Sequence, residues 1–370
     1  MTTIFVSAGE PSGDAHAAHV VAALRRAIPG IRVEGVGGAH LAAAGAELLG
    51  RIEGLTVMGF VEVVRKIPAH LRLLRAVRER LARGDVKLVV LVDYPGFHHR
   101  VAVAAHALGV PVLYYVAPQA WAWRKGRVRW LRKLTTRVAV ILPFEEAFFR
   151  AHGVPATFVG HPLLDQVPAV ADRRAAKAAL GLDPSRPVLG VFPGSRQQEV
   201  RRMWEAFRGT AERVLDRRPE VQVVVAATPA GHYPEPGALR LVYGQPVDCL
   251  AASDAALCKS GTTTLQAALT DTPLVIAYSV HRLSYEIGRR LARVRWLGLV
   301  NLVADREIAP EFVQDRVRPD LMADALLPLL AEGSTERTRQ LEDLALVRSR
   351  LGEPGASERV ARMAQEILAS

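Results

Sequence analysis

Three short segments place polar side chains directly after an apolar run, at points where a strand would end and a helix would begin. They are FPGSRQQEV around Arg196, CKSGTTTLQAAL around Ser260, and VVLVDYPGFHHR around Asp93. In open parallel sheets, ligands bind outside the carboxyl ends of the strands. We therefore expect the chemistry of this protein to lie in these turns.

The FPGSR turn delivers Gly194, Ser195 and Arg196 to the start of a helix. Backbone amides at a helix start favour an anion, and an arginine can make a forked contact with phosphate oxygens. The pattern therefore predicts an anion site. A surface turn with a solvated arginine is the alternative.

The SGTTTLQ turn places Ser260, Gly261 and Thr262 at a second helix start, where their amides and hydroxyls suit a diphosphate. Gln266, one helical turn further on, could reach a ribose hydroxyl. An ordinary Ser or Thr helix cap is the alternative. Two such turns in the same half of the chain favour a site for a nucleotide diphosphate.

Asp93 ends an apolar run in the other half of the chain, so we expect a carboxylate at the top of a central strand. A carboxylate in that place can act as a general base. It can equally cap a helix or form a turn, and the residues alone leave both readings open.

A fourth turn, GEPSGD, follows the first apolar run and carries Glu10 and Asp14. A loop that binds nucleotide phosphate would instead carry a lysine and bare amides. This acidic turn therefore indicates another ligand or a structural role.

Several patterns are missing from the sequence. It contains no Asp-x-Asp pair, the usual metal-dependent diphosphate clamp, and no P-loop. GVGGAH at 35–40 lacks the third glycine of a dinucleotide fingerprint. His16 and His19 lie one helical turn apart, but no cysteine or carboxylate completes a metal site. We expect neither a metal nor a cofactor.

The 370 residues exceed one ordinary core, and half of them are apolar, so two domains are expected. The net charge of +11 comes almost entirely from arginine, since only six of the 48 basic residues are lysine. Such a surplus suggests a phosphorylated substrate, an anionic membrane surface or nucleic acid, although genomic base composition is an alternative source.

Two features of the sequence indicate a cytosolic protein without a membrane span. Cys249 and Cys258 lie in a hydrophobic segment, which is typical of buried free thiols in a reducing compartment. The N-terminus does not resemble a secretory signal, and no apolar run approaches the roughly 20 residues of a spanning helix.

Apolar runs alternate with amphipathic stretches, which predicts parallel strands joined by helices. The fold class is therefore α/β, with two Rossmann-like, doubly wound parallel-sheet domains facing a cleft. We expect a first domain over 1–165, a second domain over 166–345, and a helix over 346–370 that returns across the cleft. The predicted strands are 3–7, 32–36, 87–92, 112–116, 137–142, 157–159, 188–192, 221–226, 241–243, 255–258 and 274–277.

The segment PQAWAWRKGRVRWLRK, at 118–133, interleaves three tryptophans with six basic residues. Such a segment can stack nucleic-acid bases, sit at a membrane interface, or form a helix with its tryptophans inward. The sequence leaves these alternatives open. A second amphipathic stretch, at 70–83, predicts a helix.

Taken together, these stretches resemble lipid-A-disaccharide synthase, an inverting GT-B glycosyltransferase of family 19. The ordered motifs are GEPSGD, GVGGAHLAAAG, VMGFVEV, VDYPGF, YYVAPQAWAWR, LPFEEAFF, FVGHPLLD, FPGSR, SGTTTLQ and NLVADREIAPEFVQ. They extend over nearly the whole chain, and PQAWAWR with GEPSGD is the most specific combination.

The resemblance implies transfer of 2,3-diacylglucosamine from UDP to the 6-hydroxyl of 2,3-diacylglucosamine 1-phosphate (lipid X), without a metal. It implies that Asp93 is the base, that Arg196 contacts UDP, and that Asn301 is linked to donor use. One departure is Gln266, where the family usually has a glutamate, and donor affinity is therefore in doubt. A glutamine still hydrogen-bonds a hydroxyl, without charge.

The resemblance implies that the first domain is the acceptor domain and the second the donor domain that holds UDP, which suggests a role for the acidic turn. We expect Glu10 to contact the acceptor and Asp14 to cap the first helix. The acceptor site implied by the resemblance comprises Glu10, Ser12, Gly13, Asp14 and Met58.

The resemblance also implies a peripheral enzyme on the cytoplasmic face of the inner membrane, where anionic lipids attract the basic surface. It leaves a homodimer open. The alternatives are another UDP-sugar enzyme of this architecture, such as a polyprenyl-linked sugar transferase or a 2-epimerase, and a nucleic-acid-binding protein. Against the last stands the absence of a recognised RNA or DNA motif.

Overall fold

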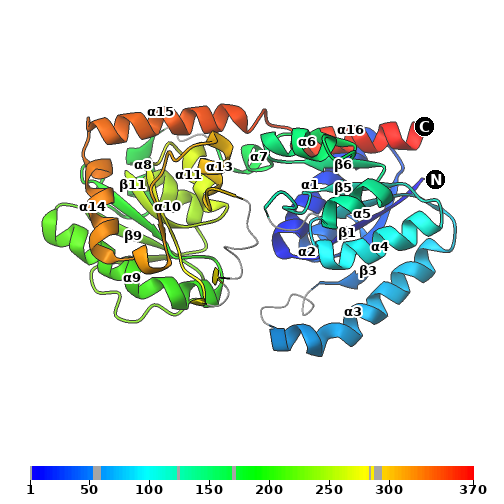
Figure 1. Cartoon of the computed structure of the whole chain (residues 1–370), viewed down its shortest axis with the longest axis horizontal. Helices are drawn as coiled ribbons and strands as arrows, with labels where there is room; N and C mark the ends of the chain where they lie inside the picture. Colours follow the sequence, from blue (N-terminus) through cyan, green and yellow to red (C-terminus); the bar gives the residue numbers. More distant parts are fainter. Residues whose placement is uncertain (1, 53–59, 123–125, 169–171, 283–284, 287–293) are drawn as a thin grey trace. The chain divides into compact units, whose positions relative to one another are not determined.

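The computed structural model describes residues 2–52, 60–122, 126–168, 172–282, 285–286 and 294–370. The chain forms two compact units (Figure 1). Unit 1 comprises Met1–Pro162 and Gly352–Ser370, and unit 2 comprises Leu163–Leu351. Each unit is described by itself below.

Unit 1 contains, within its described residues, a parallel seven-stranded sheet in the order β3-β2-β1-β4-β5-β6-β7. Its strands are β1 (Thr3–Ala8), β2 (Arg32–Gly37), β3 (Glu47–Arg51), β4 (Val86–Val92), β5 (Val112–Tyr115), β6 (Arg137–Val140) and β7 (Ala156–Phe158). Its helices are α1 (Pro11–Ala27), α2 (Ala39–Ala43), α3 (Phe60–Leu81), α4 (Pro95–Ala107), α5 (Gly126–Leu134), α6 (Pro143–Arg150) and α16 (Ala356–Ala369).

Successive residues of the central strands serve two different cores. In β1, Ile4 and Val6 pack in the cluster that includes residues of α1 and α16, whereas Phe5 packs with residues of α3, α4 and α5. In β4, Val90 packs in the cluster with α1 and α16, whereas Val89 packs in the cluster with α3, α4 and α5. Side chains alternate between the faces of a strand, so a strand covered on both faces must be apolar throughout.

The C-terminal helix α16 completes one of these layers. It lies beside α1, far away in the sequence (Figure 1). Arg26 pairs with Glu358 at 2.6 Å, and Gln365 Nε2 donates to the carbonyl of Ala27 at 2.8 Å. Arg359 Nε donates to the carbonyl of Val159 at 2.7 Å. The last helix is therefore part of unit 1.

Unit 2 contains, in the parts of the chain that are described, a parallel six-stranded sheet in the order β10-β9-β8-β11-β12-β13. Its strands are β8 (Val188–Phe192), β9 (Gln222–Ala227), β10 (Arg240–Tyr243), β11 (Ala255–Lys259), β12 (Leu274–Tyr278) and β13 (Glu311–Val313). Its helices are α7 (Leu163–Gln166), α8 (Arg173–Ala179), α9 (Gln197–Arg217), α10 (Pro246–Ala252), α11 (Thr263–Leu269), α13 (Leu299–Ala304), α14 (Pro319–Leu330) and α15 (Thr335–Arg350), with a 3-10 turn at Gln314–Arg316.

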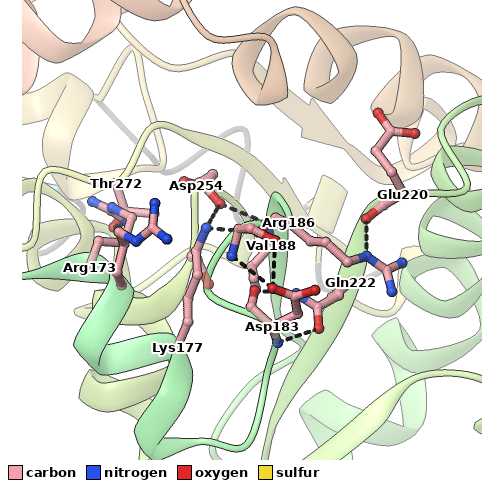
Figure 2. A network of polar contacts seen from close by, with 12 residues as sticks. Arg173, Lys177, Asp183, Arg186, Val188, Glu220, Gln222, Asp254 and Thr272 are labelled. Atoms are coloured by element: carbon pink, nitrogen blue, oxygen red, sulfur yellow. Dashed lines mark hydrogen bonds and ion pairs between the residues drawn. The ribbon is translucent and has the colours of Figure 1, made fainter.

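A buried ion pair anchors α8 to this sheet (Figure 2). Lys177 Nζ lies 2.8 Å from Asp254 Oδ2, and it also donates to the carbonyl of Arg186. The same carboxylate oxygen accepts from the amide of Val188, the first residue of β8. Because charges leave water at a cost unless they are paired, this contact fixes α8 at the amino ends of the strands. The opposite, carboxyl ends remain available for the turns.

The predicted fold class is confirmed, but two edge strands were missed. Strand β3 alternates exposed and half-buried residues, and its sequence ELLGR lacks a clear apolar run. Strand β13 has only three residues. Edge strands need less apolar surface than central ones, so their sequence signal is weak.

Other structural expectations from the sequence can be compared directly. Cys249 and Cys258 are buried free thiols, as predicted. The stretch predicted as a helix at 70–83 lies within the longer helix α3, except for its last two residues. None of the helices in the described part of the chain has the length and apolar character that a membrane span requires.

Three histidines in unit 1 are held in the neutral form: His98 and His161 are buried, and His16 is half-buried. Burial, and then the charge of the neighbouring His19, lower the pKa of His16 to about 4. Burial also lowers the pKa of His98 to about 4, although its hydrogen bond to the backbone of Asp93 acts in the opposite direction. For His161, burial and then the proximity of His16 lower the pKa to about 3.

We expect the stability of unit 1 to fall between pH 6.5 and pH 4. In the unfolded chain these histidines bind a proton near pH 6.5, whereas the folded protein excludes it, so acid favours unfolding. At pH 5 each histidine should reduce the free energy of unfolding by about 2 kcal/mol relative to pH 7. Urea unfolding followed by circular dichroism at both pH values measures this difference.

The matched variants are His161→Asn, which removes a buried titrating group, and His152→Asn on the exposed surface. The first should reduce the pH dependence by about one histidine's share, and the second should leave it unchanged. Equal stability of the parent protein at pH 7 and pH 5 would contradict the prediction.

Candidate active site

The four predicted turns occur as two pairs, each at the point where the strand order of a sheet reverses. In unit 1 the first strand, β1, lies next to β4, and Ala8 is paired with Val92. In unit 2 the first strand, β8, lies next to β11, and Phe192 is paired with Cys258. Crossovers leave in opposite directions there, which opens a crevice at the carboxyl ends. The residues of the turns that follow these four strands form the candidate site in each unit.

In unit 1 the GEPSGD and VDYPGF turns are in direct contact. A Cβ atom at Gly9 would lie 2.1 Å from the ring of Tyr94, so only glycine fits beneath this ring. A Cβ atom at Gly13 would lie 3.8 Å from that of Asp93. The acidic turn therefore lies against the candidate base.

Asp93 and Tyr94 both have left-handed backbone conformations, with φ of 56° and 49°. For residues other than glycine, this conformation costs roughly 1 to 2 kcal/mol each. The surrounding hydrogen bonds must therefore hold it. The amide of Asp93 donates to the carbonyl of Tyr115 at 3.0 Å. The carbonyl of Asp93 accepts from His98 Nδ1 at 2.6 Å and from the Tyr114 hydroxyl.

Glu10 and Tyr94 lie on the accessible side of this turn. Burial raises the pKa of Tyr94, and the negative charge of Glu10 raises it further, which places the two side chains near one another. The Tyr94 hydroxyl is 2.7 Å from His70 Nε2. Ser12 is exposed in the first turn of α1, and Gly13 is buried beside it. The contact of Glu10, Ser12 and Gly13 with an acceptor stays a prediction.

The prediction that Asp14 caps the first helix is wrong. Its carboxylate accepts instead from the amides of Gly38, His40 and Leu41, at 2.6, 2.9 and 3.3 Å. These amides belong to the start of α2, which Asp14 therefore caps from outside. The side chain is only 2% exposed, so its predicted part in acceptor binding would act through the GGAH turn. Met58, another predicted acceptor residue, lies outside the described residues.

In unit 2 a carboxylate accepts hydrogen bonds from the backbone amides of the FPGSR turn. Glu199 Oε2 accepts from the amides of Ser195 and Arg196, at 3.1 and 3.3 Å. Its other oxygen lies 3.0 Å from Lys259 Nζ, which comes from the end of β11. Gly194 has a φ of 131°, and a Cβ atom there would lie 2.6 Å from that of Glu199. Glu199 thus joins the two turns.

Around Glu199, two positive charges face one negative charge. Burial acts to raise the pKa of Glu199, but the charge and hydrogen bond of Lys259, aided by Arg196, outweigh it and the pKa is lowered. Arg196 is half-exposed, 3.8 Å from the Glu199 carboxylate. Lys259 also lies 5.6 Å above the Tyr278 ring. Two cations therefore flank one carboxylate at the end of adjacent strands, an arrangement that attracts a phosphate.

The SGTTTLQ turn follows β11 in this pair. Ser260 is buried, and its hydroxyl donates to the carbonyl of Leu297 at 2.8 Å. Gly261 is half-buried and Thr262 is exposed, immediately before α11. Gln266 lies half-buried on α11. The turn is where the sequence predicted it, and its contacts with a donor stay predictions.

Asn301 is fully buried, and its amide group makes all the hydrogen bonds available to it. Oδ1 accepts from the amides of Ile308 and Ala309, whereas Nδ2 donates to the carbonyl of Ala309 and to Glu311. Asn301 therefore holds its own segment in this structure, and its contact with a donor stays a prediction.

Glu311 connects this segment to the SGTTTLQ turn. Its carboxylate accepts from the amides of Leu297 and Gly298, at 2.9 and 2.8 Å, as well as from Asn301. Leu297 in turn accepts from Ser260. Sequence reasoning singled out neither Glu311 nor Lys259. The only signal for Lys259 was its place directly before the Ser-Gly pair, and Glu311 gave none apart from its motif.

The tryptophans of the 118–133 segment that the structure describes face inward. Trp130 packs at 5.6 Å from the ring of Tyr114, and Trp121 Nε1 donates to Glu145 at 2.9 Å. Burial raises the pKa of Glu145 to about 7, although this hydrogen bond acts to lower it. Trp123 lies outside the described residues. The exposed residues Arg129, Arg132 and Lys133 remain on the outer face.

Within the described residues, no three His, Cys, Asp or Glu side chains are arranged to hold a metal ion. Metal independence stays a prediction.

Solved structures with the same architecture include glycosyltransferases and epimerases. A UDP-GlcNAc 2-epimerase from Neisseria meningitidis, bound to UDP-GlcNAc, has a TM-score of 0.66 at 11% identity, covering 99% of this chain and 100% of its own. The calicheamicin glycosyltransferase has a TM-score of 0.63 at 19% identity, with coverages of 100% and 98%. At these identities the similarity shows the fold alone, which is of the GT-B type.

The sequence comparisons are more specific. The model of the Lipid-A-disaccharide synthetase family matches residues 4–367. A lipid-A-disaccharide synthase of Myxococcus xanthus is 42% identical over 373 residues, covering 99% of this chain and 97% of its own. That of Syntrophotalea carbinolica is 40% identical over 375 residues, with coverages of 98% and 95%. The chain therefore belongs to the lipid-A-disaccharide synthase family of glycosyltransferases.

Proposed function

We propose that this protein transfers 2,3-diacylglucosamine from its UDP derivative to the 6-hydroxyl of 2,3-diacylglucosamine 1-phosphate. The products are a β-1,6-linked disaccharide 1-phosphate and UDP. The observation that carries this proposal is the placement of a carboxylate, Asp93, at the strand reversal of unit 1, and of the cations Arg196 and Lys259 at that of unit 2. Membership of the family supplies the identity of the two sugars.

Each group has one role in the proposed reaction. Asp93 accepts the proton of the acceptor hydroxyl as its oxygen bonds to the anomeric carbon of the donor. The bond from that carbon to the UDP oxygen breaks on the opposite side, so the configuration inverts. Arg196 and Lys259 stabilise the negative charge that develops on UDP. No metal takes part in this proposal.

The remaining residues bind and orient the substrates in this proposal. Unit 1 holds the acceptor through the GEPSGD turn, where Glu10 and Ser12 bind hydroxyl or amide groups. Unit 2 holds the diphosphate at the turn from Ser260 to Thr262. Gln266 bonds the ribose, and Asn301 acts by fixing the segment that supports Ser260.

The test is a product assay with both purified substrates, analysed by thin-layer chromatography in the presence of EDTA. We expect a disaccharide phosphate and UDP in equal amounts, with no gain on adding magnesium or manganese. Conversion of the UDP-sugar without an acceptor would instead indicate an epimerase. Loss of most activity on chelation, restored by either ion, would overturn the metal-free mechanism.

Asp93→Asn should reduce kcat by roughly 10²- to 10⁴-fold, because it removes the proton acceptor but keeps the shape of the side chain. UDP affinity, measured by calorimetry, should barely change. The matched control is Asp172→Asn at the N-cap of α8, where asparagine caps equally well. Retention of more than about a tenth of the parent kcat in Asp93→Asn would exclude this residue as the base.

We further propose that unit 1 docks on the cytoplasmic face of an anionic membrane through α3 and α5. On α3, Ile67 and Leu71 are 46% and 53% exposed, one helical turn apart, and Arg72, Arg75 and Arg78 are exposed along the same helix. The outer side of α5 is basic as well. Apolar side chains flanked by arginines suit an interface of acyl chains and phosphates.

Binding to vesicles containing anionic lipid should weaken as salt rises, because ions screen the attraction beyond a Debye length of about 8 Å at physiological ionic strength. Leu71→Ser should weaken sedimentation with these vesicles. Leu108→Ser, at an equally exposed leucine that follows α4, is the control and should not. Equal binding to neutral and anionic vesicles would contradict the electrostatic part of the proposal.

A further inference from the structure

The direction of the Asp93 carboxylate depends on a backbone conformation that the local sequence does not favour. Asp93 and Tyr94 are consecutive left-handed residues, and neither is glycine. Such a pair tends to relax unless its peptide groups are held from outside. The contacts that hold the Asp93 carbonyl therefore help to set the direction of the Asp93 side chain.

Two buried side chains from neighbouring elements converge on this carbonyl. His98, on α4, places Nδ1 at 2.6 Å, and Tyr114, on β5, donates from its hydroxyl. Both residues are completely buried. A carbonyl oxygen has two lone pairs, so these two donors satisfy it fully.

The hydrogen-bond partners of His98 define its tautomer. The Asp93 carbonyl can only accept, so Nδ1 must carry the proton. Nε2 lies 2.9 Å from the hydroxyl of Ser7, a buried residue of β1. Because the imidazole is neutral, Nε2 accepts, and the Ser7 hydroxyl donates to it. The chain Ser7, His98, Asp93 therefore runs in one direction, from the central strand to the turn.

We propose that His98 is a positioning residue for Asp93: held by Ser7, it donates from Nδ1 to the Asp93 carbonyl and so fixes the direction of the carboxylate. This rests on the proposed role of Asp93 as the base. His98 itself exchanges no proton with the substrate. Tyr114 has the same role, because its hydroxyl is the second donor to the Asp93 carbonyl.

Two substitutions separate the two ring nitrogens. In His98→Asn the side-chain amide can occupy the place of Nδ1 and donate to Asp93. In His98→Gln the amide reaches the place of Nε2 and Ser7 but leaves the Asp93 carbonyl with one donor. We expect kcat to fall on the order of 10²-fold in His98→Gln, the usual effect of a misplaced reacting group, and within about tenfold of the parent in His98→Asn.

The acceptor KM and the UDP affinity should stay close to the parent values in both variants, because His98 is completely buried. The pH profile of kcat should keep its shape in His98→Gln, with a lower plateau. Loss of one limb of the profile would show that His98 exchanges a proton during the reaction, and it would overturn the proposal. So would equal kcat values in the two variants.

Tyr114→Phe keeps the ring and removes the other donor to the Asp93 carbonyl, so it should lower kcat without changing KM. This variant tests the proposal independently if the His98 variants fold poorly. If the loss of activity follows the thermal midpoint across all three variants, the role is structural and the proposal fails. Asp93→Asn belongs in the same series. Should it stay active while His98→Gln loses kcat, the base assignment fails; should it lose kcat while His98→Gln does not, only the positioning role fails.

Discussion

The reversal of strand order in each parallel sheet is the constraint on which the rest of this structure depends. At β1 and β4, and again at β8 and β11, crossovers leave two adjacent strands towards opposite faces. No helix start can cover the space between their carboxyl ends, so the turns there remain accessible. All four turns that the sequence singled out as candidate sites lie at these two places. Their position follows from this single topological feature of each sheet.

Acidic side chains in both units hold the backbone at turns and helix starts. Examples that accept two or three backbone amides each are Asp14, Glu145, Glu199 and Glu311. A buried carboxylate is expensive unless such donors satisfy it. This explains why acidic residues recur in the motifs without a metal-ligand spacing. At Asp93 the backbone is held as well, because its carbonyl accepts from His98 and from Tyr114.

The sequence indicated much of this arrangement because its signals are local. Central strands such as β4 are apolar throughout since both faces are covered, and they were predicted nearly to their ends. The turns after them were visible as glycine and polar residues following an apolar run. The edge strands β3 and β13 were missed because one neighbour and partial exposure leave little pattern.

By itself, the sequence determined the fold class, the positions of the four candidate turns, and the family through its ordered motifs. Only the tertiary structure decided which partner each polar group has. Asp14 caps α2 rather than its own helix, Glu199 reaches Lys259 on another strand, and the Ser7 hydroxyl on β1 bonds to His98 on α4. Hydrogen bonds and ion pairs are satisfied by whatever lies nearest in space, and in a sheet of parallel strands that neighbour comes from a distant part of the chain.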